Sequence, residues 1–334
     1  MRRALVTGAT GMLGSYLVQR LVENGCTVRA LVRRPESADW LRQLGGELVQ
    51  GDLADARSLH SAAAGCDAVF HAAAAIGPES AWETFRAGNV QGTINVMEAC
   101  VNAGARLVHV SSTAVYGDSR YELAPVDERA VLPRLPDADA YGRSKQEAEQ
   151  VVSRAQRAGR IWGVIVRPPV MYGERDRQFI PRVGVVMNRG FFPLCGGGRT
   201  TLPVVHANAV AEGAIRAAQT NDADGRVYNL TSDFPLTVGD LVRLASVGLG
   251  RHIRAPSLSL RTSRHLFRAL TIGLRIAGRR DLAMHANGTL EMLTNDNPFS
   301  AARAREELQW SPTIPPEIGV PEAFRWWKAH HGSA

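Results

Sequence analysis

Residues 3–14, Arg-Ala-Leu-Val-Thr-Gly-Ala-Thr-Gly-Met-Leu-Gly, decide the fold class. The short apolar run that ends at Thr7 predicts a strand, and the helical pattern after it begins within a glycine turn. Glycines there allow a tight bend, close approach of the backbone to a pyrophosphate and close packing of helix on strand. The stretch therefore predicts a dinucleotide-binding turn, although glycines that serve only the turn are the alternative. The residues expected to bind are Gly8, Thr10, Gly11, Met12, Leu13 and Gly14.

Outward from this turn, short β-branched runs alternate with helical patterns, which is typical of stacked βαβ units. The alternation predicts an α/β fold, a doubly wound parallel sheet (Rossmann) with a smaller, mainly helical C-terminal part. We expect a dinucleotide-binding domain over 1–167 and a substrate-binding part over 168–334, with segments of about 204–230 returning to the sheet. The expected strands are 3–7, 27–32, 47–50, 68–71, 106–111 and 161–166, and the expected helices lie near 12–24, 37–44, 56–64, 80–103 and 140–158.

The composition fits a globular, enzyme-sized chain. Of its 334 residues, 45% are hydrophobic and 21% charged, which excludes a disordered, collagen-like or coiled-coil protein. The four cysteines lie far apart without metal-ligand spacing, so we expect no metal site, no disulfide scaffold and a cytoplasmic location. The longest apolar stretch, 62–77, is interrupted by Asp67 and His71, and the apolar run at 4–6 reaches Gly8 too early for a secretory signal. We therefore expect neither a membrane span nor export.

The net charge of +7 comes from one segment. Residues 251–280 hold eight arginines and no Asp or Glu, and without them the rest of the chain is nearly neutral. At about 100° per residue, the arginines of 257–280 form one stripe opposite an apolar face, so the segment is amphipathic if it is helical. Three alternatives stay open: a helix packed on the core, a lid over an apolar substrate, and a membrane-surface contact. With one interleaved aromatic residue, the segment does not predict nucleic-acid binding. The apolar face would hold Leu266, Phe267, Leu270 and Leu274.

The end of the second expected strand bears on the choice of cofactor. Where an NAD-preferring site usually offers an acidic residue, about 20 residues after the glycines, this chain has Arg33 and Arg34. A guanidinium suits a 2′-phosphate through charge-assisted hydrogen bonds, so NADP(H) is favoured and NAD(H) stays open. A solvated arginine pair at a strand end is the alternative.

Small and polar residues follow the next strands. Asp52 ends the third strand and is expected either to bind the adenine amino group or to cap the following helix. The three alanines after His71 are small enough for a dinucleotide to lie against the backbone, although tight packing explains them equally well. The further cofactor residues expected on this edge are Asp52, Leu53, Ala72, Ala73, Ala74, Pro168 and Val170.

A hydroxyl, a phenol and an ammonium group are expected to converge at the same edge. Ser112 follows the fifth strand, and Tyr141 and Lys145 lie four residues apart on one face of the next helix. A phenol with a pKa near ~10 is a poor base at neutral pH, so we expect Lys145 to lower the pKa of Tyr141. Lys145 is one of two lysines among 39 basic residues, which favours a specific role over a surface pair.

These motifs resemble those of the extended short-chain dehydrogenase/reductases, the NAD-dependent epimerase/dehydratase superfamily, over residues 1–215 and more loosely beyond. The resemblance implies that Tyr141 is the acid/base and Lys145 its partner. It also implies that the Ser112 hydroxyl polarises the substrate oxygen and that Asn89 relays protons. The motifs, in the family's order, are Thr7-Gly-x-x-Gly-x-x-Gly, Gly51-Asp52, His71-Ala-Ala-Ala, Asn89-Val-Gln-Gly-Thr, Val110-Ser-Ser, Tyr141-x-x-x-Lys145 and Arg167-Pro-x-x-x-Tyr172-Gly173.

Two positions differ from the members of this family that act on nucleotide sugars. Their usual asparagine after the sixth strand corresponds to Val170, and an arginine that contacts the substrate diphosphate corresponds to Leu202. The pattern looks more like the branch of 3β-hydroxysteroid dehydrogenases and dihydroflavonol reductases. The residues expected to contact substrate are Ile76, Thr113, Met171 and Phe191.

Together these features predict an NADP(H)-dependent oxidoreductase that interconverts a secondary alcohol and a ketone on a largely apolar small molecule. One alternative is a sugar epimerase or dehydratase that keeps its dinucleotide bound. Another is a non-catalytic dinucleotide sensor or scaffold on the same fold. We expect a homodimer without a nucleic-acid partner.

Overall fold

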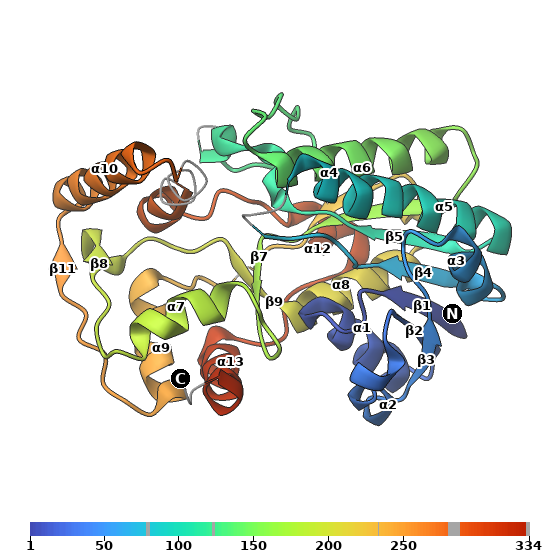
Figure 1. Cartoon of the computed structure of the whole chain (residues 1–334), viewed down its shortest axis with the longest axis horizontal. Coiled ribbons are helices and arrows are strands. Elements are labelled where there is room, and N and C mark those ends of the chain that lie inside the picture. Colours follow the sequence, from blue (N-terminus) through green and yellow to red (C-terminus); the bar gives the residue numbers. More distant parts are fainter. Residues whose placement is uncertain (78–80, 122–123, 233, 280–287, 332–334) are drawn as a thin grey trace.

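The computed structural model describes residues 1–77, 81–121, 124–232, 234–279 and 288–331. Figure 1 shows two parts side by side: a first part, in which helices flank a parallel sheet, and a smaller second part built mainly of helices. The expected fold class is therefore confirmed.

Seven parallel strands form the central sheet, in the order β10-β6-β5-β4-β1-β2-β3. β1 lies between β2 and β4, so the strand order reverses at the glycine turn, which is where ligands bind in sheets of this type. All six expected strands are present within two residues of their expected ends. The strands are β1 (Arg3–Thr7), β2 (Thr27–Val32), β3 (Gly46–Gln50), β4 (Ala68–His71), β5 (Arg106–Val110), β6 (Gly163–Arg167) and β10 (Val227–Asn229).

Helices cover both faces of this sheet (Figure 1). Alternate side chains of one strand enter opposite cores: Ala4 and Val6 pack with α1, α8 and α12, whereas Leu5 packs with α3, α5 and α6. Both faces are apolar, as a covered parallel sheet requires. These helices are α1 (Met12–Glu23), α3 (Ala56–Ala63), α5 (Gly92–Ala103), α6 (Ala140–Arg157), α8 (Ala207–Gln219) and α12 (Ala302–Leu308).

Two expected helices are shorter or interrupted. The segment 37–44 forms a 3-10 turn, Pro35–Ser37, and the single-turn α2 (Trp40–Gln43). The segment expected at 80–103, of which residue 80 lies outside the described residues, divides into α4 (Trp82–Phe85), a π-helical turn (Arg86–Gln91) and α5. A π turn adds one residue to the helical repeat and rotates the side chains that follow, a change that apolar periodicity does not reveal.

The second part has its own apolar core, formed by three helices and the residues between them. Two small parallel sheets border it: β7 pairs with β9, and β8 pairs with β11. The expectation that Val204 returns to the central sheet is therefore wrong, because this strand pairs with β7 instead, whereas β10 does return. The elements are β7 (Val170–Tyr172), α7 (Phe179–Met187), β8 (Leu194–Cys195), β9 (Val204–His206), α9 (Val238–Leu249), β11 (Ser257–Leu258), α10 (Leu260–Ile276) and α13 (Pro316–His331).

The chain crosses back to the first part near its C-terminal end. Trp310, which is 1% exposed, packs in the core beside α8, and its indole Nε1 donates a hydrogen bond of 2.9 Å to the Ala209 carbonyl. Residue 167 is thus no clean boundary, because residues near 204–230 and 301–310 complete the core of the first part.

The basic segment forms α10, and α10 does not pack its whole apolar face on the core. The alternative of a core helix for this segment is therefore wrong. Within α10 only Ser263 and Thr271 are buried, whereas Leu266 and Leu270 are 56% and 51% exposed. None of the helices among the described residues has both the length and the apolarity to cross a bilayer.

Candidate active site

The glycine turn after β1 is shaped so that side chains are excluded at two positions. Gly8 has φ +70°, and a Cβ atom there would lie 2.6 Å from the Ala73 nitrogen. A Cβ at Gly14 would lie 2.1 Å from the Gly8 carbonyl oxygen. Gly11 is the N-cap of α1, and its position offers no side-chain cap, which leaves backbone N–H groups at the positive helix end. The turn therefore fits the pyrophosphate of a dinucleotide.

A buried hydrogen-bond chain fixes the backbone beside this turn. The Thr7 hydroxyl oxygen accepts from the Ala73 N–H at 3.3 Å and lies 2.8 Å from His71 Nδ1. On the other side of the ring, His71 Nε2 lies 3.1 Å from the Thr93 hydroxyl, which donates to the Asn89 carbonyl at 2.6 Å. Since Thr93 has given its one proton to Asn89, His71 must donate from Nε2 and accept at Nδ1. Burial, with the Lys145 charge as a second cause, lowers the pKa of His71 to about 3, so the ring is neutral.

The residues expected at the adenosine end lie on the same edge of the sheet. Arg33 and Arg34 follow β2, which pairs with β1, and both are exposed. Asp52 does not cap the next helix, so that alternative is wrong: Asp55 caps α3, and the Asp52 carboxylate instead accepts from the Ala54 N–H at 2.9 Å. The N-cap of α3 is thus three residues after Asp52, because the Asp52 side chain stabilises the turn that precedes the helix.

Ser112, Tyr141 and Lys145 are brought together as expected. Ser112 follows β5 and accepts a hydrogen bond from the Ala114 N–H at 3.1 Å, and its hydroxyl is near enough to that of Tyr141 to lower the Tyr141 pKa. Lys145 lies one turn further along α6, is 3% exposed and donates from Nζ to the Val110 carbonyl at 2.9 Å. The Tyr141 ring packs edge-on against Phe85 with centroids 6.0 Å apart. A phenol, a hydroxyl and an ammonium group thus share one edge of the sheet.

The electrostatics of these groups differ from the sequence expectation. Burial raises the pKa of Tyr141, and the hydrogen bond from Ser112 opposes that rise. The expected lowering by Lys145 is not found, because the ammonium is directed to the Val110 carbonyl. Burial also lowers the pKa of Lys145 to about 8, with the Glu149 carboxylate acting against that change. Tyr141 is therefore protonated at neutral pH and suited to donate a proton.

A buried ion pair holds α6 against the sheet. Glu149 lies one turn beyond Lys145, and its two carboxylate oxygens accept from Arg167 Nε at 2.8 Å and Nη2 at 2.6 Å. Arg167 also donates to the Tyr116 hydroxyl at 2.8 Å, and that hydroxyl donates to Asn229. Nothing in the sequence pattern marked Glu149, although its spacing of four from Lys145 could have.

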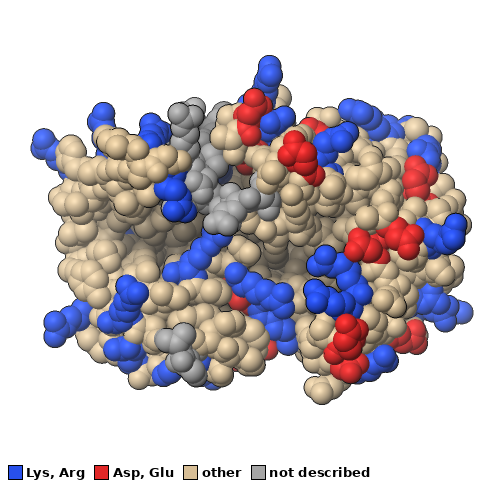
Figure 2. All heavy atoms as spheres, in the orientation of Figure 1, with Lys and Arg blue, Asp and Glu red and all other residues tan. Residues whose placement is uncertain are grey.

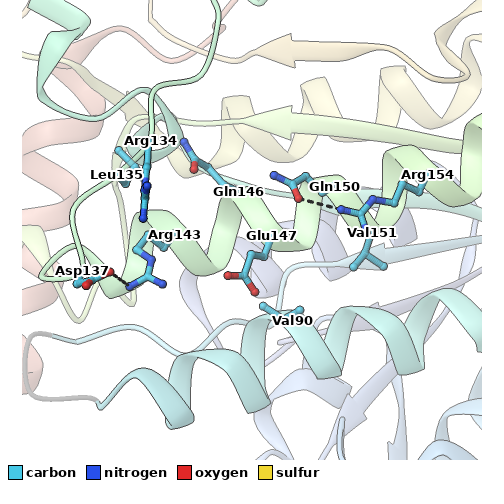
Figure 3. A pocket seen from close by; sticks show the side chains of 10 residues that line it. All are labelled: Val90, Arg134, Leu135, Asp137, Arg143, Gln146, Glu147, Gln150, Val151 and Arg154. Carbon is cyan, nitrogen blue, oxygen red and sulfur yellow. Dashed lines mark hydrogen bonds and ion pairs between the residues drawn. The ribbon is translucent and has the colours of Figure 1, made fainter.

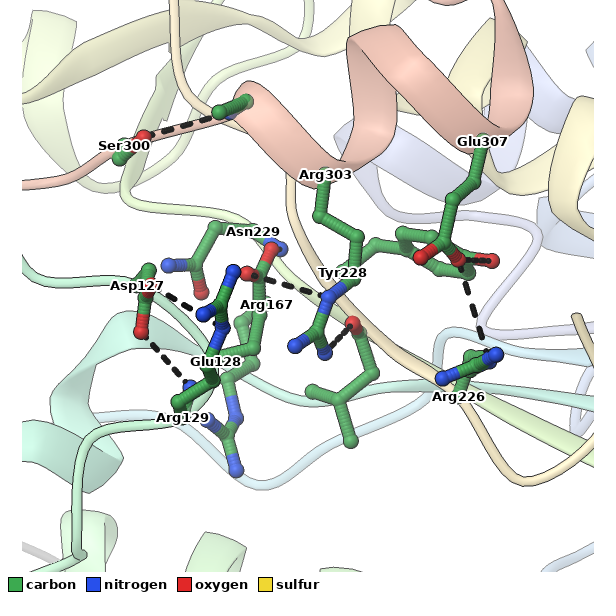
Figure 4. Close-up of polar contacts among 12 residues, drawn as sticks. Asp127, Glu128, Arg129, Arg167, Arg226, Tyr228, Asn229, Ser300, Arg303 and Glu307 are labelled. Carbon is green, nitrogen blue, oxygen red and sulfur yellow. Dashed lines mark hydrogen bonds and ion pairs between the residues drawn. The ribbon is translucent and has the colours of Figure 1, made fainter.

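The network continues around Arg167 into the C-terminal part of the chain. Glu128 accepts from the Asn229 N–H at 2.6 Å and lies 3.7 Å from Arg303, while Tyr228 donates to Glu307 at 2.8 Å (Figure 4). These bonds join β10 to α12. The Arg167-Pro motif is thereby a structural junction of the site.

Asn89 is held by three hydrogen bonds inside the π-helical turn. Its side-chain nitrogen donates to the Ser144 hydroxyl at 2.9 Å and to the Ala75 carbonyl at 3.2 Å, and its side-chain oxygen accepts from the Ala75 N–H at 2.7 Å. Asn89 thus ties α6 to the segment after β4. The expected proton relay stays a prediction.

The residues expected to contact substrate are spread over both parts. Thr113 is buried, and its N–H donates to the carbonyl of buried Pro168 at 3.0 Å, next to Ser112. Ile76 and Val170 are 56% and 37% exposed on the same edge. Phe191, 49% exposed, lies in the second part beside Arg254, and Met171 lies in β7. The face seen in Figure 2 is hollowed between the two parts, with basic side chains around the hollow.

The loop after β7 holds Arg175, a residue that belongs to none of the sequence motifs. Arg175 has φ 65°, and its guanidinium lies 5.4 Å from the ring centroids of both Tyr16 and Trp40. Its buried Nε has no hydrogen-bond partner among the described residues. Since Tyr16 belongs to α1 and Trp40 to α2, the stack fastens this loop to the helices beside the glycine turn.

A separate groove of about 480 Å³ runs along α6 on the side opposite Lys145 (Figure 3). Its lining is mostly charged and polar, including Arg143, Glu147 and Arg154. It shares no residue with the glycine turn or with the Ser112 and Tyr141 pair. The groove is therefore distinct from the candidate active site.

Comparisons with known proteins identify the family and the fold of the chain. The sequence model of the NAD dependent epimerase/dehydratase family matches residues 4–231. A 4-hydroxy-2-methyl-3-oxo-4-farnesyl-3,4-dihydroquinoline-1-oxide ketoreductase from Stigmatella aurantiaca is 34% identical over 95% of this chain and 94% of its own. A sterol-4-alpha-carboxylate 3-dehydrogenase, decarboxylating, from Dictyostelium discoideum is 30% identical over 69% of this chain and 71% of its own. The structure of UDP-glucuronic acid 4-epimerase from Bacillus cereus in complex with NAD shares the fold, with a TM-score of 0.75, 20% identity and coverage of 98% and 99%.

Proposed function

The chain belongs to the NAD dependent epimerase/dehydratase family and is an NAD(P)-dependent enzyme, and from this premise we propose that it interconverts a secondary alcohol and a ketone on a largely apolar substrate. The observation that carries the proposal is a convergence of three groups: Lys145 Nζ donates to the Val110 carbonyl two residues before Ser112, and Tyr141 lies one turn before Lys145 on the same helix. Two relatives, named as a ketoreductase and a sterol 3-dehydrogenase, support this reaction class.

Each catalytic side chain has one task at the substrate oxygen. The Ser112 hydroxyl donates a hydrogen bond to that oxygen and polarises the carbonyl. Tyr141 donates its proton to the same oxygen as negative charge develops there, and its raised pKa keeps it protonated for this step. Lys145 stays fixed to the Val110 carbonyl, which leaves its other N–H groups free to orient Tyr141 and the cofactor.

The dinucleotide, when bound, supplies or accepts the hydride. The glycine turn would hold its pyrophosphate, and Ala72, Ala73 and Ala74 would lie along it. We assign NADP(H) as the preferred form, because Arg33 and Arg34 are exposed cations at the end of β2, where a 2′-phosphate is expected.

An apolar substrate is favoured over a nucleotide sugar by the residues around the site. Leu202 is 3% exposed in the core of the second part, so this position offers nothing to a substrate diphosphate. Val170 is 37% exposed where the sugar-specific relatives usually have an asparagine. At both positions this chain has an aliphatic side chain where the sugar-specific relatives have a polar one. Aliphatic side chains suit a substrate with an apolar ring or chain.

The test is a panel of apolar ketones and secondary alcohols with purified protein. We expect NADPH absorbance to fall in proportion to the alcohol formed. Conversion of a nucleotide sugar without net change in the dinucleotide would favour the epimerase alternative. Tight NADPH binding without turnover of any compound would favour the non-catalytic alternative.

A further inference from the structure

α10 forms an apolar surface that no described residue covers. It lies at the far edge of the second part, next to β11 and away from the central sheet (Figure 1). Its large aliphatic side chains are exposed: 56% for Leu266, 51% for Leu270, 49% for Ile272 and 83% for Ile276. Exposed aliphatic residues gathered on one helix indicate a contact with another body.

The same helix carries a basic flank. Four exposed arginines belong to it, and none forms an ion pair with a described residue. The segment 251–280 contains no Asp or Glu that could neutralise them. Figure 2 shows no acidic side chain over this end of the visible face. The arginines are Arg261, Arg264, Arg268 and Arg275.

The apolar and basic groups occupy separate arcs. At about 100° per residue, Ser263 and Thr271 mark the arc that contacts the protein, and the four arginines fall within about 60° on one side of it. The remaining outward arc holds Ile272, Ile276 and Leu266, with His265 as its one titratable residue. The helix thus presents an aliphatic face bordered by cations.

We propose that α10 docks on the surface of a bilayer that contains anionic lipid, with its aliphatic face among the acyl chains and its arginines at the headgroups. This arrangement buries the exposed aliphatic area and neutralises the arginine flank together. The helix lies in the interface, since none of the described helices can cross a bilayer.

Two other partners fit the arcs less well. A second copy packed through the same helix would offer the arginine flank no acidic residue, because 251–280 contains none. A nucleic acid would use the arginines but leave the aliphatic face uncovered. The proposal does not rest on the proposed oxidoreductase function.

The test is flotation of the full chain with vesicles. We expect the wild type to bind vesicles of equal parts phosphatidylcholine and phosphatidylserine, to bind phosphatidylcholine alone weakly, and to be released by salt. Joint Arg261→Gln, Arg264→Gln and Arg268→Gln substitution should weaken binding on the order of 100-fold. Joint Ile272→Ser and Ile276→Ser substitution should also weaken it, even at low salt.

A matched triple variant tests whether vesicle binding depends on the arginines of α10 or only on the net charge of the protein. Joint Arg57→Gln, Arg154→Gln and Arg157→Gln substitution removes three exposed charges from α3 and α6, in the first part of the molecule. It should leave vesicle binding unchanged. The proposal is overturned if the wild type binds neither vesicle, or if both triple variants lose binding equally. It is also overturned if the isoleucine variant retains vesicle binding but converts a dimer to a monomer in ultracentrifugation.

Discussion

Glu149 and Arg167 form a buried two-pronged ion pair, with oxygen–nitrogen distances of 2.8 and 2.6 Å and side chains 6% and 5% exposed. Since Glu149 follows Lys145 by one helical turn and Arg167 ends β6, the pair fixes α6 on the sheet beside the proposed catalytic groups. The position of Tyr141 therefore depends on a contact two turns away.

Breaking this pair should destabilise the protein strongly. Glu149→Gln leaves the Arg167 guanidinium buried without its counter-charge, so we expect the free energy of unfolding to fall by about 3–5 kcal/mol. Urea denaturation measures it. The neighbour Glu147, on the outer side of α6, provides the control: Glu147→Gln should change stability by less than about 0.5 kcal/mol. Equal effects of the two substitutions would contradict the role given to the ion pair.

The two lysines should differ in what their removal does. At neutral pH, Lys145 is charged in the folded and in the unfolded protein. Its pKa is lowered to about 8 in the folded protein, so burial of the charge costs free energy. Lys145→Met should therefore abolish turnover yet raise the free energy of unfolding by about 1–3 kcal/mol at pH 7. Above pH 8 the native Lys145 loses its proton first, so this gain should shrink towards pH 10.5. Lys328→Met, which removes a hydrogen bond from Nζ to the Leu249 carbonyl, should not raise the free energy of unfolding.

Acid should destabilise the protein through buried histidines. His71 and His206 have folded pKa values of about 3 and 4, and burial holds the pKa of His109 well below its usual range. They are neutral in both states at pH 7.5, but below pH 6.5 the unfolded chain takes up protons that the native protein does not. The free energy of unfolding should fall towards pH 5. Each histidine should contribute up to about 1.4 kcal/mol of this loss per pH unit. His206→Gln should make the fall shallower, whereas His252→Gln, at an exposed position, should not.

The cofactor preference should reside in the cations after β2. Arg33→Asp should weaken NADPH binding by about 1–3 kcal/mol, the range for charge-assisted hydrogen bonds, and affect NADH less. Isothermal titration with both dinucleotides measures the two affinities. Arg157→Asp, at the exposed C-terminal end of α6, should leave both affinities unchanged. Tighter binding of NADH than NADPH by the wild type would be inconsistent with the assignment.

The fold of the first part could be predicted from the sequence because its signals are local. The glycine turn and the alternating apolar runs specify each βαβ unit within about 30 residues. The partners of β9 and Trp310 could not be predicted in this way. Val204 meets β7 across the intervening helix α7, and Trp310 meets Ala209 across α9, α10 and α12, so no local pattern links the partners.

Within the candidate site, the identities of the groups were more predictable than their electrostatics. The spacing of four brings Tyr141 and Lys145 to one helix face, as expected. The pKa of Tyr141 depends on burial and on the direction of the Lys145 ammonium, neither of which the spacing reveals. In α10, the same apolar periodicity suits a core helix and an exposed one, so exposure of Leu266 required the structure.

The central claim is that Tyr141 transfers the proton in a net ketone reduction. The direct test is NADPH consumption with one verified apolar ketone by the wild type and by Tyr141→Phe, with NADPH binding measured for both. We expect the variant to fold and bind NADPH with unchanged affinity while turnover falls about 100- to 10,000-fold. A Tyr141→Phe protein that binds NADPH and reduces the ketone at the wild-type rate would contradict the account.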